Sequence, residues 1–248
     1  MVRPGLADAL TIGNALCGAA AIGVVVATPW AVDAASESAT LRIVALLILA
    51  GVVLDVCDGA VARARGGTPL GRHLDSLADV VTFGVAPVIA VVGVAIRRSS
   101  PWETIALAIG GLAFVAAALV RLADFDAGRS RERFFTGMPS PLAAVTALSV
   151  GLVLTEPWLT AVAIVLIGWL MVSGIRYPHS RGVGLIAEAA GVAVAVVGLL
   201  GVIDVRIPAL LAIAGCVVVA PVALAASERR GRRSGAAAKT PRGVSADP

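Results

Sequence analysis

The sequence predicts an all-α fold, a polytopic membrane bundle of about eight transmembrane helices, and three observations support this. The 248-residue chain is 58% hydrophobic and only 15% charged, and its mean hydropathy is +0.95. Apolar runs of about 17–25 residues recur along it, and each is long enough to cross a bilayer as a helix. These runs are continuous rather than alternating, which argues against a membrane β-barrel.

The expected spans divide the chain into one membrane domain, residues 1–226, and a tail, residues 227–248. Pro101, Pro139 and Pro157 fall near the starts of later spans, where a helix tolerates proline. The tail is basic and rich in Ala and Ser, a composition typical of disorder. A polar stretch at 28–40 predicts a loop after the first span. The spans are expected at residues 10–30, 41–62, 73–96, 102–123, 139–155, 158–175, 184–203 and 207–226.

The distribution of Lys and Arg predicts the orientation of the bundle in the cell membrane. Eight spans place 16 of the 20 basic residues on one side and four on the other, namely Arg42, Arg97, Arg98 and Arg206. Loops rich in Lys and Arg stay in the cytoplasm, so both termini are expected there. This pattern explains the net charge of +4 without nucleic-acid binding, so no nucleic-acid partner is expected.

Four carboxylates are unusual in so apolar a chain. Asp55 and Asp58 are three residues apart in the second expected span, and Asp75 and Asp79 are four apart in the third. Each pair shares a helix face, and a short turn at residues 65–69 folds the two faces together at the cytoplasmic side. A carboxylate in a bilayer costs about 2.5–3.5 kcal/mol on insertion scales, so neutralising cations are expected. Oxygen ligands favour hard divalent ions, Mg²⁺, Mn²⁺ or Ca²⁺.

Small and basic residues beside the acids indicate a bulky anionic ligand. Gly59, Ala62 and Gly71 leave room near the carboxylates, and Arg63 follows Asp58 by one to two turns. Because arginine binds phosphate groups well, this composition favours a diphosphate ligand and phosphoryl transfer. Salt bridges at the membrane surface would be one alternative, and a proton or cation pathway would be another. The pathway would require acids spread across the membrane rather than clustered at one face.

Two segments match the signature of the CDP-alcohol phosphotransferases at every specified position. They are Asp55-Val-Cys-Asp58-Gly59-Ala-Val-Ala62-Arg63 and Gly71-Arg-His-Leu-Asp75-Ser-Leu-Ala-Asp79. The chain therefore resembles this family, whose members move a phosphatidyl or related group from a CDP-linked lipid to an alcohol and release CMP. Residues 75–87 and 134–141 resemble the phosphatidylserine synthase subgroup, and residues 6–14 and 171–178 resemble archaetidylserine synthases. The resemblance implies L-serine as the acceptor, in phospholipid biosynthesis, and a homodimer, the common state of relatives.

The resemblance also implies a role for each motif residue. Four acids would bind two divalent metal ions, Mg²⁺ or Mn²⁺: Asp55, Asp58, Asp75 and Asp79. Of these, Asp79 would also be the catalytic general base. The CDP-lipid contacts are expected at Gly59, Ala62, Arg63, Thr68, Gly71, Asp8 and Thr11.

The acceptor site is where this chain departs from the subgroup. Many serine-specific members carry Arg-Leu-Ala-Arg-Phe-Asn after the fourth span, and here the stretch is Arg121-Leu-Ala-Asp124-Phe-Asp126. Either Arg121 or Arg129 would hold the serine carboxylate, or Asp124 or Asp126 would meet an ammonium group. Alternatively, the two acids are solvated and pair with nearby arginines.

Two other functions stay open at this point. Glycerol 3-phosphate or inositol phosphate would be an acceptor with the same chemistry, because the Arg-rich residues 129–133 could bind its phosphate. A non-enzymatic transporter or scaffold with a vestigial metal site is the alternative of another class. An intact Asp79 argues against that last reading.

Overall fold

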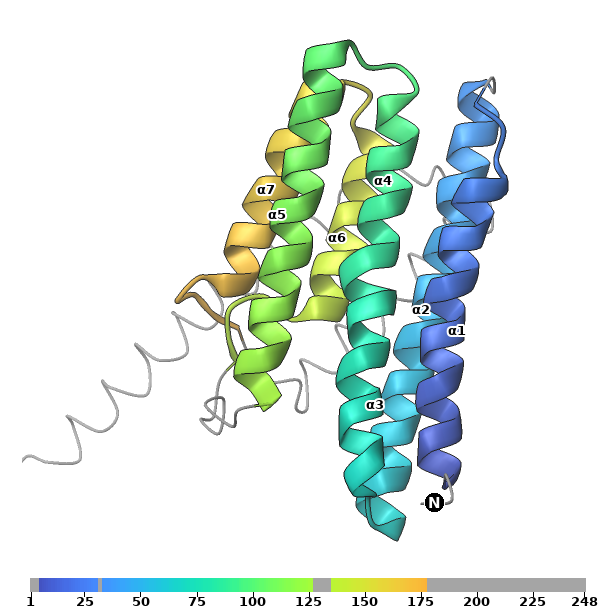
Figure 1. The fold of residues 1–248 in the computed structure, drawn as a ribbon, viewed down its shortest axis with the longest axis vertical. Helices are drawn as coiled ribbons and strands as arrows, with labels where there is room; N and C mark the ends of the chain where they lie inside the picture. Colours follow the sequence, from blue (N-terminus) through green and yellow to red (C-terminus); the bar gives the residue numbers. More distant parts are fainter. Residues whose placement is uncertain (1–4, 31–32, 127–134, 178–248) are drawn as a thin grey trace, which may run out of the picture.

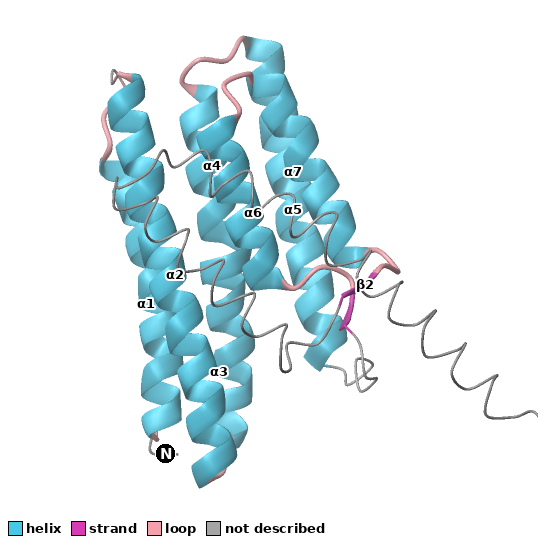
Figure 2. Cartoon of the chain, turned by 180° about the vertical axis from the view of Figure 1, so that it is seen from behind, coloured by secondary structure: helices cyan, strands magenta, loops and turns pink. Residues whose placement is uncertain are grey.

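The structure is a computed structural model that describes residues 5–30, 33–126 and 135–177. Within these residues the chain forms a bundle of helices whose long axes run side by side (Figure 1). The predicted helical bundle is confirmed, and two paired two-residue strands are the exception to it (Figure 2). The elements in chain order are α1 (Leu6–Ala27), α2 (Ala34–Arg65), α3 (Pro69–Asp79), the π-helix η1 (Val80–Val85), α4 (Ala86–Ile96), α5 (Pro101–Asp126), β1 (Phe135–Thr136), α6 (Ser140–Val153), α7 (Pro157–Val172) and β2 (Arg176–Tyr177).

Four helices of the described part are long and apolar enough to cross a membrane. They are α1, α2, the continuous run Leu70–Ile96 and α5, and they agree with the first four expected spans. The fifth and sixth expected spans correspond to α6 and α7, which have 14 and 16 residues. Both are shorter than the roughly 20 residues that usually cross a bilayer. The last two expected spans, 184–203 and 207–226, and the tail at 227–248 lie outside the described residues.

The loop expected at residues 28–40 is shorter than predicted, because α2 begins at Ala34. Asp33 caps this helix, and its carboxylate accepts a hydrogen bond from the Ser36 amide at 2.9 Å. Such a cap satisfies amides that lack partners in the first turn of a helix. Hydrogen bonds from Ser36 also hold the pKa of the Asp33 carboxyl below its usual range. The prediction weighed the polarity of residues 34–40 and missed the cap, so it is wrong there.

The hairpin of α2 and α3 is built by its turn residues. Gly66 ends α2 with a φ of +87°, a backbone conformation that L side chains rarely adopt. Thr68 then caps α3, where its hydroxyl accepts a hydrogen bond from the Gly71 amide at 2.8 Å. Pro69 is the first residue of α3, a position where a missing amide hydrogen has no consequence. The second and third spans therefore turn back on each other as predicted.

α1 packs closely against α2 and η1, and glycines make this approach possible. A Cβ on Gly18 of α1 would lie 2.7 Å from the Thr82 Cα of η1. A Cβ on Gly51 of α2 would lie 2.7 Å from the Thr82 Cγ2. The two glycines therefore leave no room for a side chain, and so close an approach of backbones is typical of membrane helices that meet through small residues. Three backbones therefore converge around Thr82, a residue with no exposed surface.

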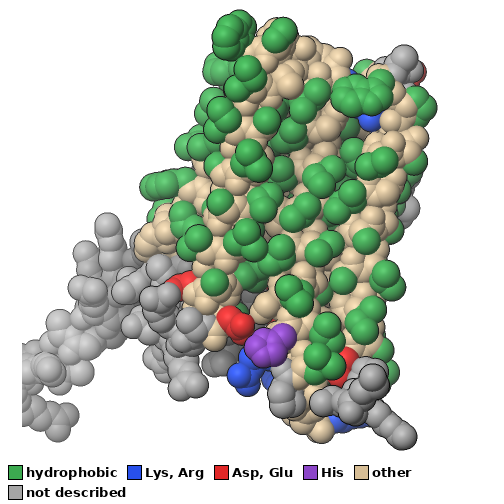
Figure 3. Space-filling model, in the orientation of Figure 1, with side chains coloured by type: hydrophobic (Ala, Val, Ile, Leu, Met, Phe, Trp, Pro, Cys, Tyr) green, Lys and Arg blue, Asp and Glu red, His purple; other side chains and the backbone are tan. Residues whose placement is uncertain are grey.

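The outer surface of the bundle is mostly apolar, and its charged side chains lie mainly at one end. Figure 3 shows hydrophobic side chains over most of one face, with acidic, basic and histidine side chains gathered mainly near its lower end. Large apolar side chains such as Trp102, Val26 and Leu112 are more than 70% exposed. Such exposure suits a surface that faces lipid rather than water.

We expect Gly18→Ala to lower the free energy of unfolding by about 1–3 kcal/mol, the usual cost of overpacking. The added methyl group would meet the η1 backbone, which cannot move aside as a flexible side chain can. Thermal denaturation in detergent micelles measures the effect. Gly23→Ala on the same helix is the matched control, since nothing lies within 4 Å of a Cβ there. Equal melting temperatures for the two variants would contradict the close packing of α1 on η1.

Candidate active site

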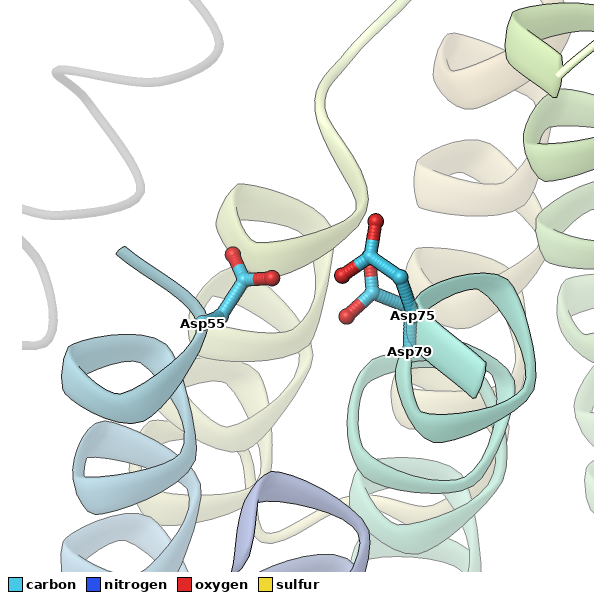
Figure 4. Close-up of side chains that lie close together, drawn as sticks. All are labelled: Asp55, Asp75 and Asp79. Atoms are coloured by element: carbon cyan, nitrogen blue, oxygen red, sulfur yellow. The ribbon is translucent and has the colours of Figure 1, made fainter. Parts of the chain in front are cut away.

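Three of the four motif acids come together between α2 and α3. One carboxylate oxygen from each of Asp55, Asp75 and Asp79 lies within 4.8 Å of the others. Asp55 projects from α2 toward Asp75 and Asp79, which lie one turn apart on α3 (Figure 4). All three side chains are partly buried. The prediction that the hairpin brings acidic faces together is therefore confirmed for these three residues.

This carboxylate cluster suits a divalent cation. Two full negative charges 4.8 Å apart repel each other by roughly 3–4 kcal/mol at an effective dielectric constant of about 20. Among the described residues, no Lys or Arg forms an ion pair with any of the three. Carboxylate oxygens are the ligands that Mg²⁺ and Mn²⁺ prefer. The donor set therefore fits such an ion, and these residues would hold it.

The fourth motif acid, Asp58, points to α1 instead. It is only 5% exposed, and its Oδ2 accepts a hydrogen bond of 2.6 Å from the Thr11 hydroxyl. This bond gives Asp58 a partner within the protein and joins α1 to α2. Its role as a ligand of a second metal ion, and the contact of Thr11 with CDP-lipid, stay predictions.

Asp8 and Thr68, two of the expected CDP-lipid contacts, are hydrogen-bonded to each other. The buried Asp8 carboxylate accepts from the Thr68 hydroxyl at 3.0 Å and from the Gly5 amide at 2.7 Å. Gly71 lies against this pair, since a Cβ there would be 2.6 Å from Asp8 Oδ1. These residues thus fasten the start of α1 to the turn of the hairpin. Their contact with CDP-lipid stays a prediction.

Arg63 lies back over Gly59 near the end of α2. A Cβ on Gly59 would be 3.2 Å from Arg63 Nη1, so the glycine leaves room for the guanidinium group. Arg63 is exposed, and Ala62 beside it is partly buried. The arrangement keeps a cation at the surface one to two turns beyond Asp58. That these three residues bind CDP-lipid also stays a prediction.

Three of the expected acceptor residues lie at the end of α5. Arg121 and Asp124 are partly buried and Asp126 is exposed, while Arg129 lies outside the described residues. The Arg121 guanidinium faces Gly137, where a Cβ would be 3.4 Å from its Nη1. Since α5 also contacts α3, this part of the chain belongs to the same bundle region as the acids. A role in acceptor binding stays a prediction.

Asn14 is the residue that sequence reasoning missed. It is fully buried in α1, and its Nδ2 donates a hydrogen bond to Asp79 Oδ1 at 3.2 Å. Its position continues a buried polar strip on α1 with Asp8 and Thr11, at intervals of three residues. The 248-residue sequence holds no other asparagine and no glutamine, a signal that could have singled out this residue.

Comparisons with known proteins agree with the motif. Residues 5–177 match a family model described as CDP-alcohol phosphatidyltransferase. The chain is 35% identical over 153 residues to an archaetidylserine synthase of Methanothermobacter thermautotrophicus, an alignment that covers 60% of this chain and 64% of that protein. It is 33% identical over 173 residues to a CDP-diacylglycerol–serine O-phosphatidyltransferase of Bacillus subtilis, covering 69% of this chain and 89% of that protein. The archaeal relative is thus matched over less than two thirds of its length.

We expect Asp75→Asn to weaken Mn²⁺ binding by more than about tenfold, since even outer partners of metal ligands are worth roughly 10–100-fold. Electron paramagnetic resonance of free Mn²⁺ in titrations of the purified protein measures this affinity. Asp33→Asn is the matched control, because Asp33 is an exposed acid at the start of α2. Equal Mn²⁺ affinity in the two variants would contradict a metal site at the cluster.

Proposed function

The chain belongs to the CDP-alcohol phosphatidyltransferase family, and on that premise we propose that it transfers a phosphatidyl or archaetidyl group from a CDP-linked lipid to the hydroxyl of L-serine. The reaction releases CMP and makes a phospholipid. The observation that carries this proposal is the convergence of Asp55, Asp75 and Asp79 within 4.8 Å, in the spacing of the family motif. Similarity to two proteins named as serine-lipid synthases supports L-serine as the acceptor.

Each motif acid has a task in this proposal. Asp55, Asp58, Asp75 and Asp79 would hold two divalent ions, Mg²⁺ or Mn²⁺, which supply Lewis-acid stabilisation of the diphosphate when bound. Asp79 acts as the general base and takes the proton from the serine hydroxyl. The serine oxygen forms a bond to the lipid-side phosphorus, and the bond from that phosphorus to the CMP oxygen breaks. The exposed guanidinium of Arg63 stabilises the charge on the departing phosphate.

The CDP-lipid would lie along the small residues of α2 and the hairpin turn. Gly59, Ala62 and Gly71 offer little bulk there, and Gly59 already makes room for Arg63. Asp8 and Thr68 shape the wall of this region through their mutual hydrogen bond, and Thr11 does so through Asp58. Because these polar side chains have partners within the protein, the wall keeps its shape without the nucleotide.

Serine would bind on the α5 side of the acids. Arg121 would pair with the serine carboxylate, and Asp124 or Asp126 would meet its ammonium group, with Arg129 as the further basic candidate. The contact between α3 and α5 supports this assignment, since it joins the elements that carry the base and these residues.

The proposed location is the cell membrane, with eight spans and with the termini and active site in the cytoplasm. Basic residues support this orientation, because Arg63, Arg65 and Arg72 flank the acidic hairpin, where cytoplasmic loops are rich in arginine. Arg97 lies at the other end of the bundle, where it donates to the Thr28 carbonyl at 3.1 Å. A homodimer, the state that the family resemblance implies, is part of the proposal.

A CMP-release assay tests the acceptor. Purified protein with Mn²⁺ and CDP-lipid is expected to release CMP when L-serine is added, and chelation with EDTA should abolish the release until Mn²⁺ is restored. Turnover with glycerol 3-phosphate or inositol phosphate, but none with serine, would show that the acceptor is wrong. If no acceptor in the screen supports CMP release, only the non-enzymatic transporter or scaffold remains.

Asp79→Asn tests the general base. We expect turnover to fall by about 10²–10⁴-fold, the usual contribution of a positioned base, while CDP-lipid still binds. Isothermal titration with CDP-lipid and single-turnover CMP release measure the two effects, with Asp33→Asn as the control. A loss of turnover of less than about threefold, far short of the expected 10²-fold, would remove Asp79 as the base.

A further inference from the structure

The single carboxamide side chain of the sequence is only half satisfied. Asn14 Nδ2 donates to Asp79 Oδ1 at 3.2 Å. Asn14 Oδ1 is buried and has no hydrogen-bond partner among the described residues, and it would lie 2.9 Å from a Cβ on Gly51. Buried polar atoms are normally paired, so an unpaired one requires a reason.

The chemistry of the amide decides which way this side chain points. Asn14 presents an N–H donor to a carboxylate oxygen, a charge-assisted arrangement. The opposite orientation would place Oδ1 against Asp79 Oδ1, so two acceptors would face each other. The missing side chain of Gly51 leaves space for Oδ1 on the other side. The carboxamide is therefore held as a donor to Asp79, and the unpaired oxygen is the consequence.

The backbone of Asn14 is fastened to the segment that follows Asp79. The Thr82 hydroxyl donates to the Asn14 carbonyl at 2.9 Å, and Thr82 is fully buried. Thr82 belongs to η1, the π-helix that begins at Val80, directly after Asp79. Short π-helical segments that interrupt α-helices are frequent at functional sites. One residue of α1 thus contacts both the Asp79 side chain and the π-helix behind it.

From these contacts we infer that Asn14 is a positioning residue that holds one oxygen of Asp79, so that the other stays available to the cluster with Asp55 and Asp75. A neutral donor suits this task. Lys or Arg would compete with a metal cation for the carboxylate, and an acid would add repulsion to the three carboxylates already present. Only the identity of Asp79 as the base rests on the proposed function. The hydrogen bond and the cluster do not.

Asn14→Leu tests the inference, since leucine has a similar volume and no donor. We expect Mn²⁺ binding to weaken by about tenfold or more, and kcat to fall by about 10–100-fold with KM for serine changed by less than about threefold. Melting temperature without metal should fall only slightly, because removal of the unpaired Asn14 Oδ1 offsets part of the cost of the lost hydrogen bond to Asp79. Asn14→Ala carries the same expectations for Mn²⁺ and kcat, and it decides the matter if Asn14→Leu does not fold.

Thr146→Val is the matched control, because Thr146 is a buried residue of α6 whose hydroxyl, among the described residues, bonds only the Leu142 carbonyl of its own helix. Its Mn²⁺ affinity and kcat should match those of the unchanged protein. Unchanged Mn²⁺ affinity and kcat in the Asn14 variants would overturn the inference. So would losses that the Thr146 control shares. The proposed function is tested separately, by CMP release from the unchanged protein with serine. If that assay failed, the comparison of Mn²⁺ affinity between the Asn14 variants and the unchanged protein would still test the inference.

Discussion

The repulsion among Asp55, Asp75 and Asp79 is the constraint on which the rest of this structure depends. Like charges within 4.8 Å drive the two arms of the hairpin apart, and an apolar surrounding strengthens the effect. The packing of α1 opposes it, because glycines such as Gly18 and Gly51 let three backbones meet around one buried threonine. The favourable free energy of that packing offsets the repulsion among the acids before any cation binds.

Contacts at the opposite end of the bundle set the position of α1 as well. Arg97 donates to the Thr28 carbonyl at 3.1 Å, and its guanidinium lies 5.7 Å from the centre of the Trp30 ring. Arg98 pairs with Glu37 at 3.0 Å, at the start of α2. A salt bridge near the surface contributes only about 0–1 kcal/mol. Together they fasten the loop between α1 and α2 to the end of α4, so α1 is held at both ends.

Local sequence patterns predicted the hairpin well, and they did not predict its long-range partners. The spacing of the acids defines shared helix faces, and the turn residues encode the reversal, so the convergence of Asp55 with Asp75 and Asp79 followed from nearby residues alone. The bond from Thr11 to Asp58 joins residues 47 apart in the chain, and the bond from Asn14 to Asp79 joins residues 65 apart. No periodicity states which face of α1 meets the hairpin. The start of α2 at Ala34 was missed for a different reason. The Asp33 cap is a local signal for a helix start, but the prediction gave more weight to the polarity of the residues that follow it.

The proposed acceptor side of the site depends on other contacts than the carboxylate cluster does. Gly137 has a φ of +82°, and a Cβ there would collide with the Met171 carbonyl, so only glycine fits. The next residue, Met138, donates its amide to the Leu170 carbonyl at 3.0 Å. These contacts pin the segment before α6 to the end of α7, and Arg121 faces that segment. The position of Arg121 is therefore tied to α7, outside the motif. The carboxylate cluster thus depends on the packing of α1, whereas the position of Arg121 depends on packing at α7.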